Sequence, residues 1–62
     1  MLLVRVERCL RTTGISAARF GRDSVGDPRF VSDLRRGREA RNRTTQRVLV
    51  HIEKLEAAKN AP

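Results

Sequence analysis

Aromatic residues, paired cysteines and long apolar runs are scarce or missing in this sequence. With no Trp, no Tyr and 2 Phe, any core must consist mainly of aliphatic side chains. A single Cys9 excludes an internal disulfide, and together with the one histidine, His51, it leaves no metal-ligand set. The apolar start from Met1 to Val4 is too short for a signal segment or a transmembrane span. We therefore expect a cytoplasmic protein that needs no metal or other cofactor.

Positive charge dominates the residues that are present. The 62 residues include 14 Lys and Arg against 7 Asp and Glu, which gives a formal net charge of +7. Such an excess implies a polyanionic partner, either nucleic acid or an acidic membrane surface, and nucleic acid is the favoured one. Since the bias toward Arg over Lys can simply follow genome base composition, only the net excess argues for function.

Periodic apolar residues predict one all-α domain over residues 1–58, compact and with four to five helices. The first helix carries an apolar stripe formed by Leu2, Leu3, Val6, Cys9 and Leu10. Gly14 ends this helix, and Ser16 is a good N-cap for a second helix over about 16–24. Gly21 costs the second helix roughly 1 kcal/mol of helix propensity relative to Ala, so we expect a neighbouring helix to cross close to it.

A third helix is predicted over about 27–36, because Asp27 can cap it and Pro28 suits its first position. Its inward residues are Val31 and Leu34, with Phe30 at the flank, and Gly37 stops it.

A fourth helix follows a basic loop and is capped by Thr44 and Thr45. Its apolar stripe comprises Val48, Leu49, Ile52 and Leu55. Residues 59–62 should fray as a C-terminal tail, because they have nothing to bury.

Two short helices joined by a tight turn, then an Arg-rich loop and another helix, match the helix-turn-helix layout. The segment from Ser16 to Gly37 resembles the Cro and lambda-repressor-like family of DNA-binding proteins. Phe20 and Gly21 match its core and small positions, and the resemblance extends to short uncharacterised bacterial proteins of repressor-like type. It implies that the third helix reads DNA while the following loop and the helix N-termini lie along the DNA backbone.

The outward face of the predicted third helix supplies the candidate base-reading side chains. These are Arg29, Ser32, Asp33 and Arg36. Arg29 can pair bidentately with guanine, a contact worth about 1–3 kcal/mol of discrimination, whereas Ser32 is permissive. Asp33 either accepts from cytosine or pairs within the protein with Arg29, Arg36 or a neighbouring helix.

Arginines of the loop and of the helix starts form the densest positive patch, which also includes Arg35. Within the run from Arg35 to Arg47 the only negative charge is that of Glu39. The candidate phosphate-binding residues are Ser16, Arg19, Arg22, Arg38, Arg41, Arg43, Thr44, Thr45 and Arg47.

These features favour a sequence-specific protein that binds double-stranded DNA, a repressor-like transcriptional regulator of a bacterium or phage, associated with the nucleoid and acting by occupying its site. One alternative is a basic RNA-binding or nucleoid-associated module that does not read bases. Another is an antitoxin-like or adaptor module whose partner is an acidic protein. A homodimer is a further hypothesis, based on Val50 and Ala57 on the outward side of the fourth helix.

Enzymatic activity is not expected. His51 has no Cys or Ser partner in a recognisable motif, and so short a chain does not easily enclose a small-molecule substrate. Membrane binding is not expected either, because the core needs Leu2, Leu3 and Leu10.

Overall fold

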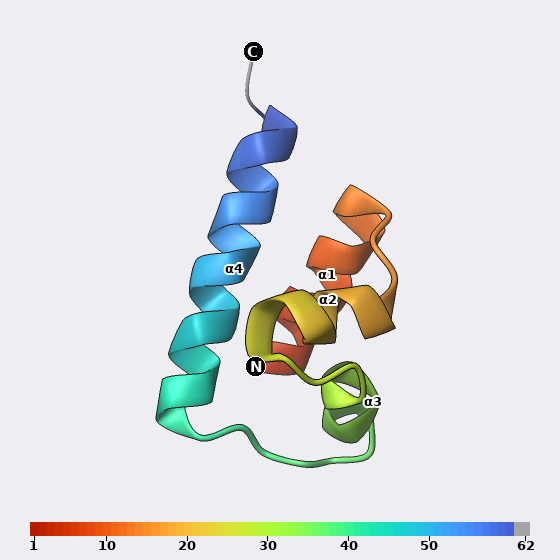
Figure 1. Ribbon diagram of the computed structural model, residues 1–62, viewed down its shortest axis with the longest axis vertical. Helices are drawn as coiled ribbons and strands as arrows, with labels where there is room; N and C mark the ends of the chain where they lie inside the picture. The colour runs from red at the N-terminus through yellow and green to blue at the C-terminus, as the bar shows by residue number, and fades with distance from the viewer. Residues whose placement is uncertain (61–62) are drawn as a thin grey trace.

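The computed structural model describes residues 1–60, and these form four helices (Figure 1). The helices are α1 (Leu2–Thr13), α2 (Ala17–Val25), α3 (Phe30–Arg35) and α4 (Asn42–Asn60). No strand occurs within residues 1–60, so the predicted all-α class with four helices is confirmed. Helix α4 packs along α1, while α2 packs on α3 and also touches α4 (Figure 1).

All four helices contribute to a single core. Its buried hydrophobic residues are Val6, Cys9, Phe20, Phe30, Val31, Leu34, Val48 and Ile52. The predicted inward positions are thereby confirmed, except that Phe30 was expected at the flank of its helix and is instead 7% exposed. Burial, together with the nearby Glu56 carboxylate, raises the pKa of the Cys9 thiol above its usual range. Cys9 is therefore a small core residue that stays protonated at neutral pH.

The boundary between α1 and α2 follows the predicted capping chemistry. Gly14 adopts a left-handed conformation with φ 74°, and its N–H donates to the Leu10 carbonyl at 2.9 Å. Ser16 then caps α2, because its Oγ accepts from the Arg19 N–H at 3.2 Å. Both caps satisfy backbone groups that a helix end leaves unpaired.

Gly21 is the point where α2 is approached most closely by the chain that follows it. A Cβ atom at this position would overlap the Asp27 carbonyl oxygen and lie 3.2 Å from the Phe30 Cβ. The Asp27 N–H also donates to the Gly21 carbonyl at 3.2 Å. The close crossing predicted for Gly21 is therefore confirmed, and it involves the turn as well as the start of α3.

Helix α3 begins at Phe30, three residues later than the predicted start at Asp27. The Asp27 side chain does accept a backbone N–H, but from Arg29 at 2.9 Å, within a turn that precedes the helix. The Asp27 carbonyl accepts from the Phe30 N–H at 3.1 Å and completes this turn. An Asp side chain that bonds two residues ahead forms a turn as readily as a helix cap, and here the turn is formed.

Gly37 ends the third helix as predicted. It has φ 101°, its N–H donates to the Leu34 carbonyl at 3.0 Å, and the Arg38 N–H donates to the Asp33 carbonyl at 3.0 Å. This pair of hydrogen bonds is the Schellman arrangement, which favours glycine at the left-handed position.

Helix α4 is longer at both ends than predicted. It begins at Asn42, so Thr44 and Thr45 lie inside its first turn, and the prediction that they cap the helix is wrong. The Thr45 N–H already donates to the Arg41 carbonyl at 2.8 Å. At the other end α4 includes Lys59 and Asn60, which were placed in the frayed tail, while the rest of that tail lies outside the described residues. The Lys59 ammonium donates to the Thr12 carbonyl, where the last turn of α1 leaves carbonyls unpaired.

A bidentate ion pair joins α3 to α1. Arg35 donates through Nε to one carboxylate oxygen of Glu7 at 2.9 Å and through Nη2 to the other at 2.7 Å. The hydrogen bonds from Arg35 favour the ionised carboxylate and hold the pKa of Glu7 below its usual range. The pair therefore fixes the end of α3 while both groups remain charged.

Replacement of Gly21 by alanine tests the close crossing. In an open helix, Gly21→Ala should stabilise by about 1 kcal/mol through helix propensity. Here the added methyl overlaps backbone, so we expect the free energy of unfolding to fall by about 1–3 kcal/mol in urea denaturation. Ala18→Gly, at an exposed position of the same helix, measures the propensity term alone. A Gly21→Ala variant more stable than the wild type would contradict the crossing.

The Glu7–Arg35 pair predicts a pH-dependent difference between wild type and Glu7→Gln. Because the pKa of Glu7 is lower in the folded state, the folded protein binds fewer protons than the unfolded chain, and the pair stabilises above the unfolded pKa. The wild type should thus be the more stable at neutral pH, and the difference should vanish as pH falls through the folded pKa. Thermal unfolding of both proteins across the acid range measures this, and a difference independent of pH would refute it.

Candidate nucleic-acid interface

The four predicted base-reading residues lie on one helical stretch, although only two belong to α3 itself. Arg29 and Arg36 flank α3 with near-helical backbone angles, φ −93° and ψ 0° for the first and φ −83° and ψ −2° for the second. The Asp33 N–H donates to the Arg29 carbonyl at 2.9 Å, and the Arg36 N–H donates to the Ser32 carbonyl at 3.1 Å. Their spacing of three, four and seven residues therefore places them on one side of the stretch.

These four side chains differ in how accessible they are. Arg29, Ser32 and Arg36 are exposed to solvent. Asp33 is half-buried, and its carboxylate accepts a hydrogen bond from Arg38 Nη1 at 3.0 Å. Of the two roles considered for Asp33, the structure contains the pairing within the protein, but its partner is Arg38 of the loop, which was predicted only as a phosphate-binding residue. This pairing offsets the one negative charge on the stretch.

The predicted phosphate-binding residues of α2 extend from its N-cap, Ser16, to Arg22 in its last turn. The Ser16 hydroxyl already serves as the cap of α2. Arg19 and Arg22 are both exposed, and Arg19 Nε lies 3.5 Å from an Asp23 carboxylate oxygen. An exposed pair of this kind contributes little to stability.

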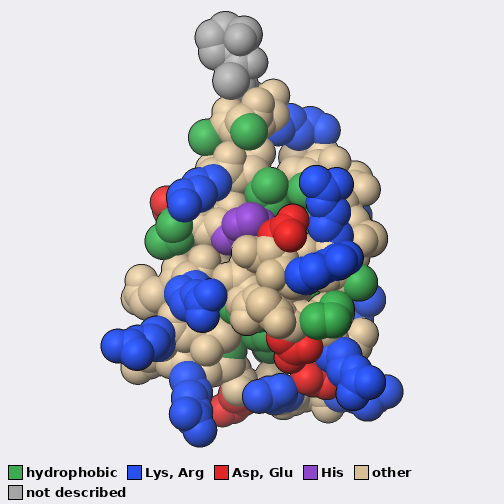
Figure 2. Space-filling model, in the orientation of Figure 1, with side chains coloured by type: hydrophobic (Ala, Val, Ile, Leu, Met, Phe, Trp, Pro, Cys, Tyr) green, Lys and Arg blue, Asp and Glu red, His purple; other side chains and the backbone are tan. Residues whose placement is uncertain are grey.

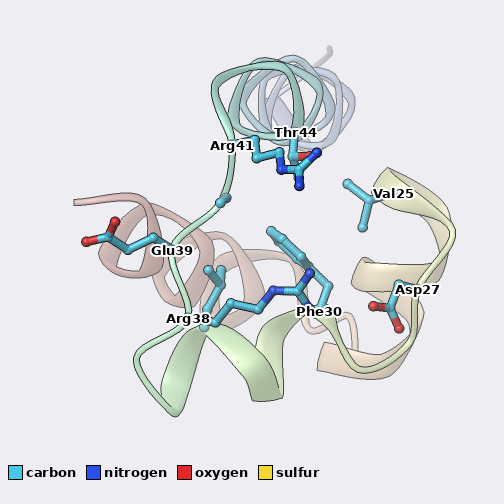
Figure 3. Close-up of a pocket in the computed structure, with 9 residues that line it drawn as sticks. Val25, Asp27, Phe30, Arg38, Glu39, Arg41 and Thr44 are labelled. Atoms are coloured by element: carbon cyan, nitrogen blue, oxygen red, sulfur yellow. The ribbon is translucent and has the colours of Figure 1, made fainter.

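The loop and the first turn of α4 enclose a groove of about 470 Å³ against the α2–α3 turn (Figure 3). Its apolar wall includes Phe30, and the side chains of Arg38 and Arg41 extend along it, with Thr44 on the α4 side. Glu39 is directed away from the groove in Figure 3. The groove is thus apolar on one wall, and its lining carries the acidic residues Asp27 and Glu39 as well as the two arginines.

The remaining candidates do not all face this groove. Arg43 is exposed in the first turn of α4. Thr45 borders a different and mostly apolar groove together with Leu2 and Leu3, and its N–H is already bonded to Arg41. Arg47 borders a third groove, between α2 and α4. The set predicted as one patch is therefore divided among three parts of the surface.

Charge is unevenly distributed along the chain. The segment 16–47 contains nine Arg and four acidic residues, whereas the residues after it contain two Lys and two Glu. Figure 2 shows Lys and Arg side chains over both halves of the visible face, several of them around the lower end, where α3 and the loop lie. Because guanidinium groups match phosphate oxygens and guanine edges bidentately, this end of the molecule is suited to a polyanion.

Sequence reasoning placed Arg35 in the positive patch, yet its guanidinium is bonded to Glu7. These residues are 28 positions apart, so no local pattern indicates the pair.

His51 is half-buried and packs edge-on against the Phe20 ring, with ring centroids 5.5 Å apart. Val50 is 48% exposed and Ala57 is exposed on α4, and the homodimer based on them stays a hypothesis.

Two features of other kinds of site do not occur within residues 1–60. No three His, Cys, Asp or Glu side chains in this range gather so that they could hold a metal ion. None of the helices described here combines the length and apolar character that crossing a bilayer requires.

Comparisons of the chain with protein-family models, with curated proteins and with solved structures found no match.

Proposed function

We propose that this protein binds double-stranded DNA in a sequence-specific manner and acts as a repressor-like transcriptional regulator of a bacterium or phage. In this proposal the stretch from Arg29 to Arg36 enters the major groove, and the arginines of the loop bind phosphates. The resemblance of the segment from Ser16 to Gly37 to helix-turn-helix proteins similar to Cro and the lambda repressor supports this proposal.

One observation carries the proposal: three exposed hydrogen-bonding side chains lie on one helical stretch, formed by α3 and the residue at each of its ends, and this stretch is anchored at both ends. Arg29, Ser32 and Arg36 face solvent, while Gly21 fixes the start of the helix and Glu7 fixes its end through Arg35. Side chains held on a rigid element can discriminate between bases, because little conformational freedom is left to lose on binding.

The dimensions of α3 suit a major groove. An α-helix is about 10–12 Å across with its side chains, and the groove is about 12 Å wide. A helix of six residues is about 9 Å long, so it spans only a few base pairs. Most of the affinity must therefore come from phosphate contacts next to it, and Arg38, Arg41 and Arg43 lie in the adjoining loop and first turn of α4.

Base reading by Arg29 is tested by selecting sites from random duplex DNA. We expect a sequence motif to emerge with the wild type, and Arg29→Ala to relax the preference at one position by about 1–3 kcal/mol, because a bidentate contact to guanine is lost. Titration of both proteins on the selected site and on its single-base variants measures this loss.

Arg8→Ala is the matched control, because Arg8 is an equally exposed arginine on α1, outside the proposed interface. It should leave the base preference unchanged. If every duplex binds alike, the alternative of a non-specific nucleic-acid module is favoured. If instead an acidic protein co-purifies in stoichiometric amount and DNA does not bind, the adaptor or antitoxin-like alternative is favoured.

The phosphate contacts predict a strong dependence of affinity on salt. If about six phosphates are neutralised, log K should fall with log salt concentration with a slope near −5. Arg41→Gln should make this slope less steep by about 1 and weaken binding to all sequences alike. Fluorescence anisotropy over a range of salt concentrations gives both slopes, and an unchanged slope would remove Arg41 from the interface.

A further inference from the structure

One side of helix α4 carries a row of basic residues. Arg43, Arg47, His51 and Lys54 follow one another at intervals of four, four and three residues, which places them along one side of the helix. Glu56 lies on the opposite side, where its negative charge helps to raise the pKa of the Cys9 thiol in α1. One side of α4 is thus basic, whereas the side toward α1 carries both an acidic residue, Glu56, and a basic one, Lys59.

The cationic side of α4 borders a shallow groove of about 370 Å³ against the C-terminal half of α2. Arg47, His51 and Lys54 line it from α4, together with Gln46 and Val50, while Asp23 and Ser24 line it from α2. In Figure 2 the histidine lies near the middle of the visible face, with Lys and Arg side chains on either side of it.

The groups that α2 contributes to this groove are already engaged. Asp23 lies 3.5 Å from Arg19, which offsets its charge. The Ser24 hydroxyl donates to the Phe20 carbonyl at 2.7 Å. The cations of α4, Arg47 and Lys54, have no ion pair within residues 1–60 at 4.0 Å or less, so the groove keeps a net positive charge.

This surface is distinct from the one that carries α3. Its lining shares no residue with the groove formed by Arg38, Arg41 and Thr44. Figure 1 shows α4 leaving the loop at the end of the molecule where α3 lies and running to the opposite end. From Arg47 to Lys54 the basic lining extends for about 10 Å along the helix, away from α3. Lys54 therefore lies on a surface other than the one proposed to contact the first DNA segment, farther along α4.

We propose that the α2–α4 groove binds the phosphate backbone of a second segment of duplex DNA, without reading its sequence, while α3 occupies the first. This inference rests on the proposed function, because it assumes that α3 engages DNA. A chain with both surfaces bridges two segments, and so brings together distant parts of one DNA molecule.

A two-step capture experiment tests the bridge. The protein is bound to an immobilised duplex that carries its selected site, unbound protein is washed away, and a fluorescent duplex of random sequence is added. The wild type should retain the fluorescent duplex. Lys54→Glu should reduce its retention by about tenfold, because the reversal removes one phosphate contact and adds repulsion, while binding to the immobilised site persists. Lys54→Arg should keep the retention of the wild type.

Arg8→Glu is the matched control, because it makes the same change of net charge at an exposed position of α1. It should leave retention of the second duplex unchanged. Equal losses in the two reversals, full retention by Lys54→Glu, or a wild type that holds the first duplex but retains no second one would each overturn the bridge. Failure of the protein to prefer any immobilised site would instead refute the proposed function, so the two failures are distinguishable.

Discussion

The contact between the backbone of α2 at Gly21 and the carbonyl of Asp27 is the constraint on which the rest of this small protein depends. It allows the turn to lie directly on α2, because no Cβ stands between them. The same approach brings Phe30 against Gly21 and so seats its ring in the core. A larger residue at this position would push the turn outward and move the start of α3 with it.

Helix α3 has its position because other elements hold it. A helix of six residues is far below the length that is stable alone in water, so its own hydrogen bonds do not maintain it. It is held by three buried side chains, by the ion pair from Arg35 to Glu7, and by the hydrogen bonds that close on Gly37. The exposed side chains between these anchors consequently keep a defined direction, which is what recognition of a rigid partner requires.

Much of this fold could be predicted from local chemistry. The apolar periodicity identified the four helices, and Gly14, Ser16, Gly21 and Gly37 each act as their residue type predicts. The predicted start of the third helix at Asp27 was wrong, because Asp followed by Pro is compatible with both a helix cap and a turn. The contact of the Asp27 carbonyl with Gly21 favours the turn. The start of α4 was wrong because two threonines offered plausible caps where the helix had already begun.

Less of the candidate site could be predicted, because its pairings depend on the tertiary structure. The spacing of Arg29, Ser32, Asp33 and Arg36 correctly indicated a common side of one helical stretch. The partners of Arg35 and Asp33 depend on where α1 and the loop lie, and neither is encoded in a local pattern. The same holds for Arg47. The run of arginines in the sequence placed it in the loop patch, but because α2 packs against α4, Arg47 lines another groove.

The packing of α1 against α4 also has a consequence for how the protein comes to be folded. Helix α1 is made before α4 and packs most extensively against it, and Lys59 of α4 contacts the end of α1 at Thr12. Until α4 has emerged from the exit tunnel, the apolar stripe of α1 lacks its main cover, so the domain cannot complete its fold before all of α4 has been made. In that interval the nascent chain exposes an amphipathic, arginine-rich helix to the surrounding solvent.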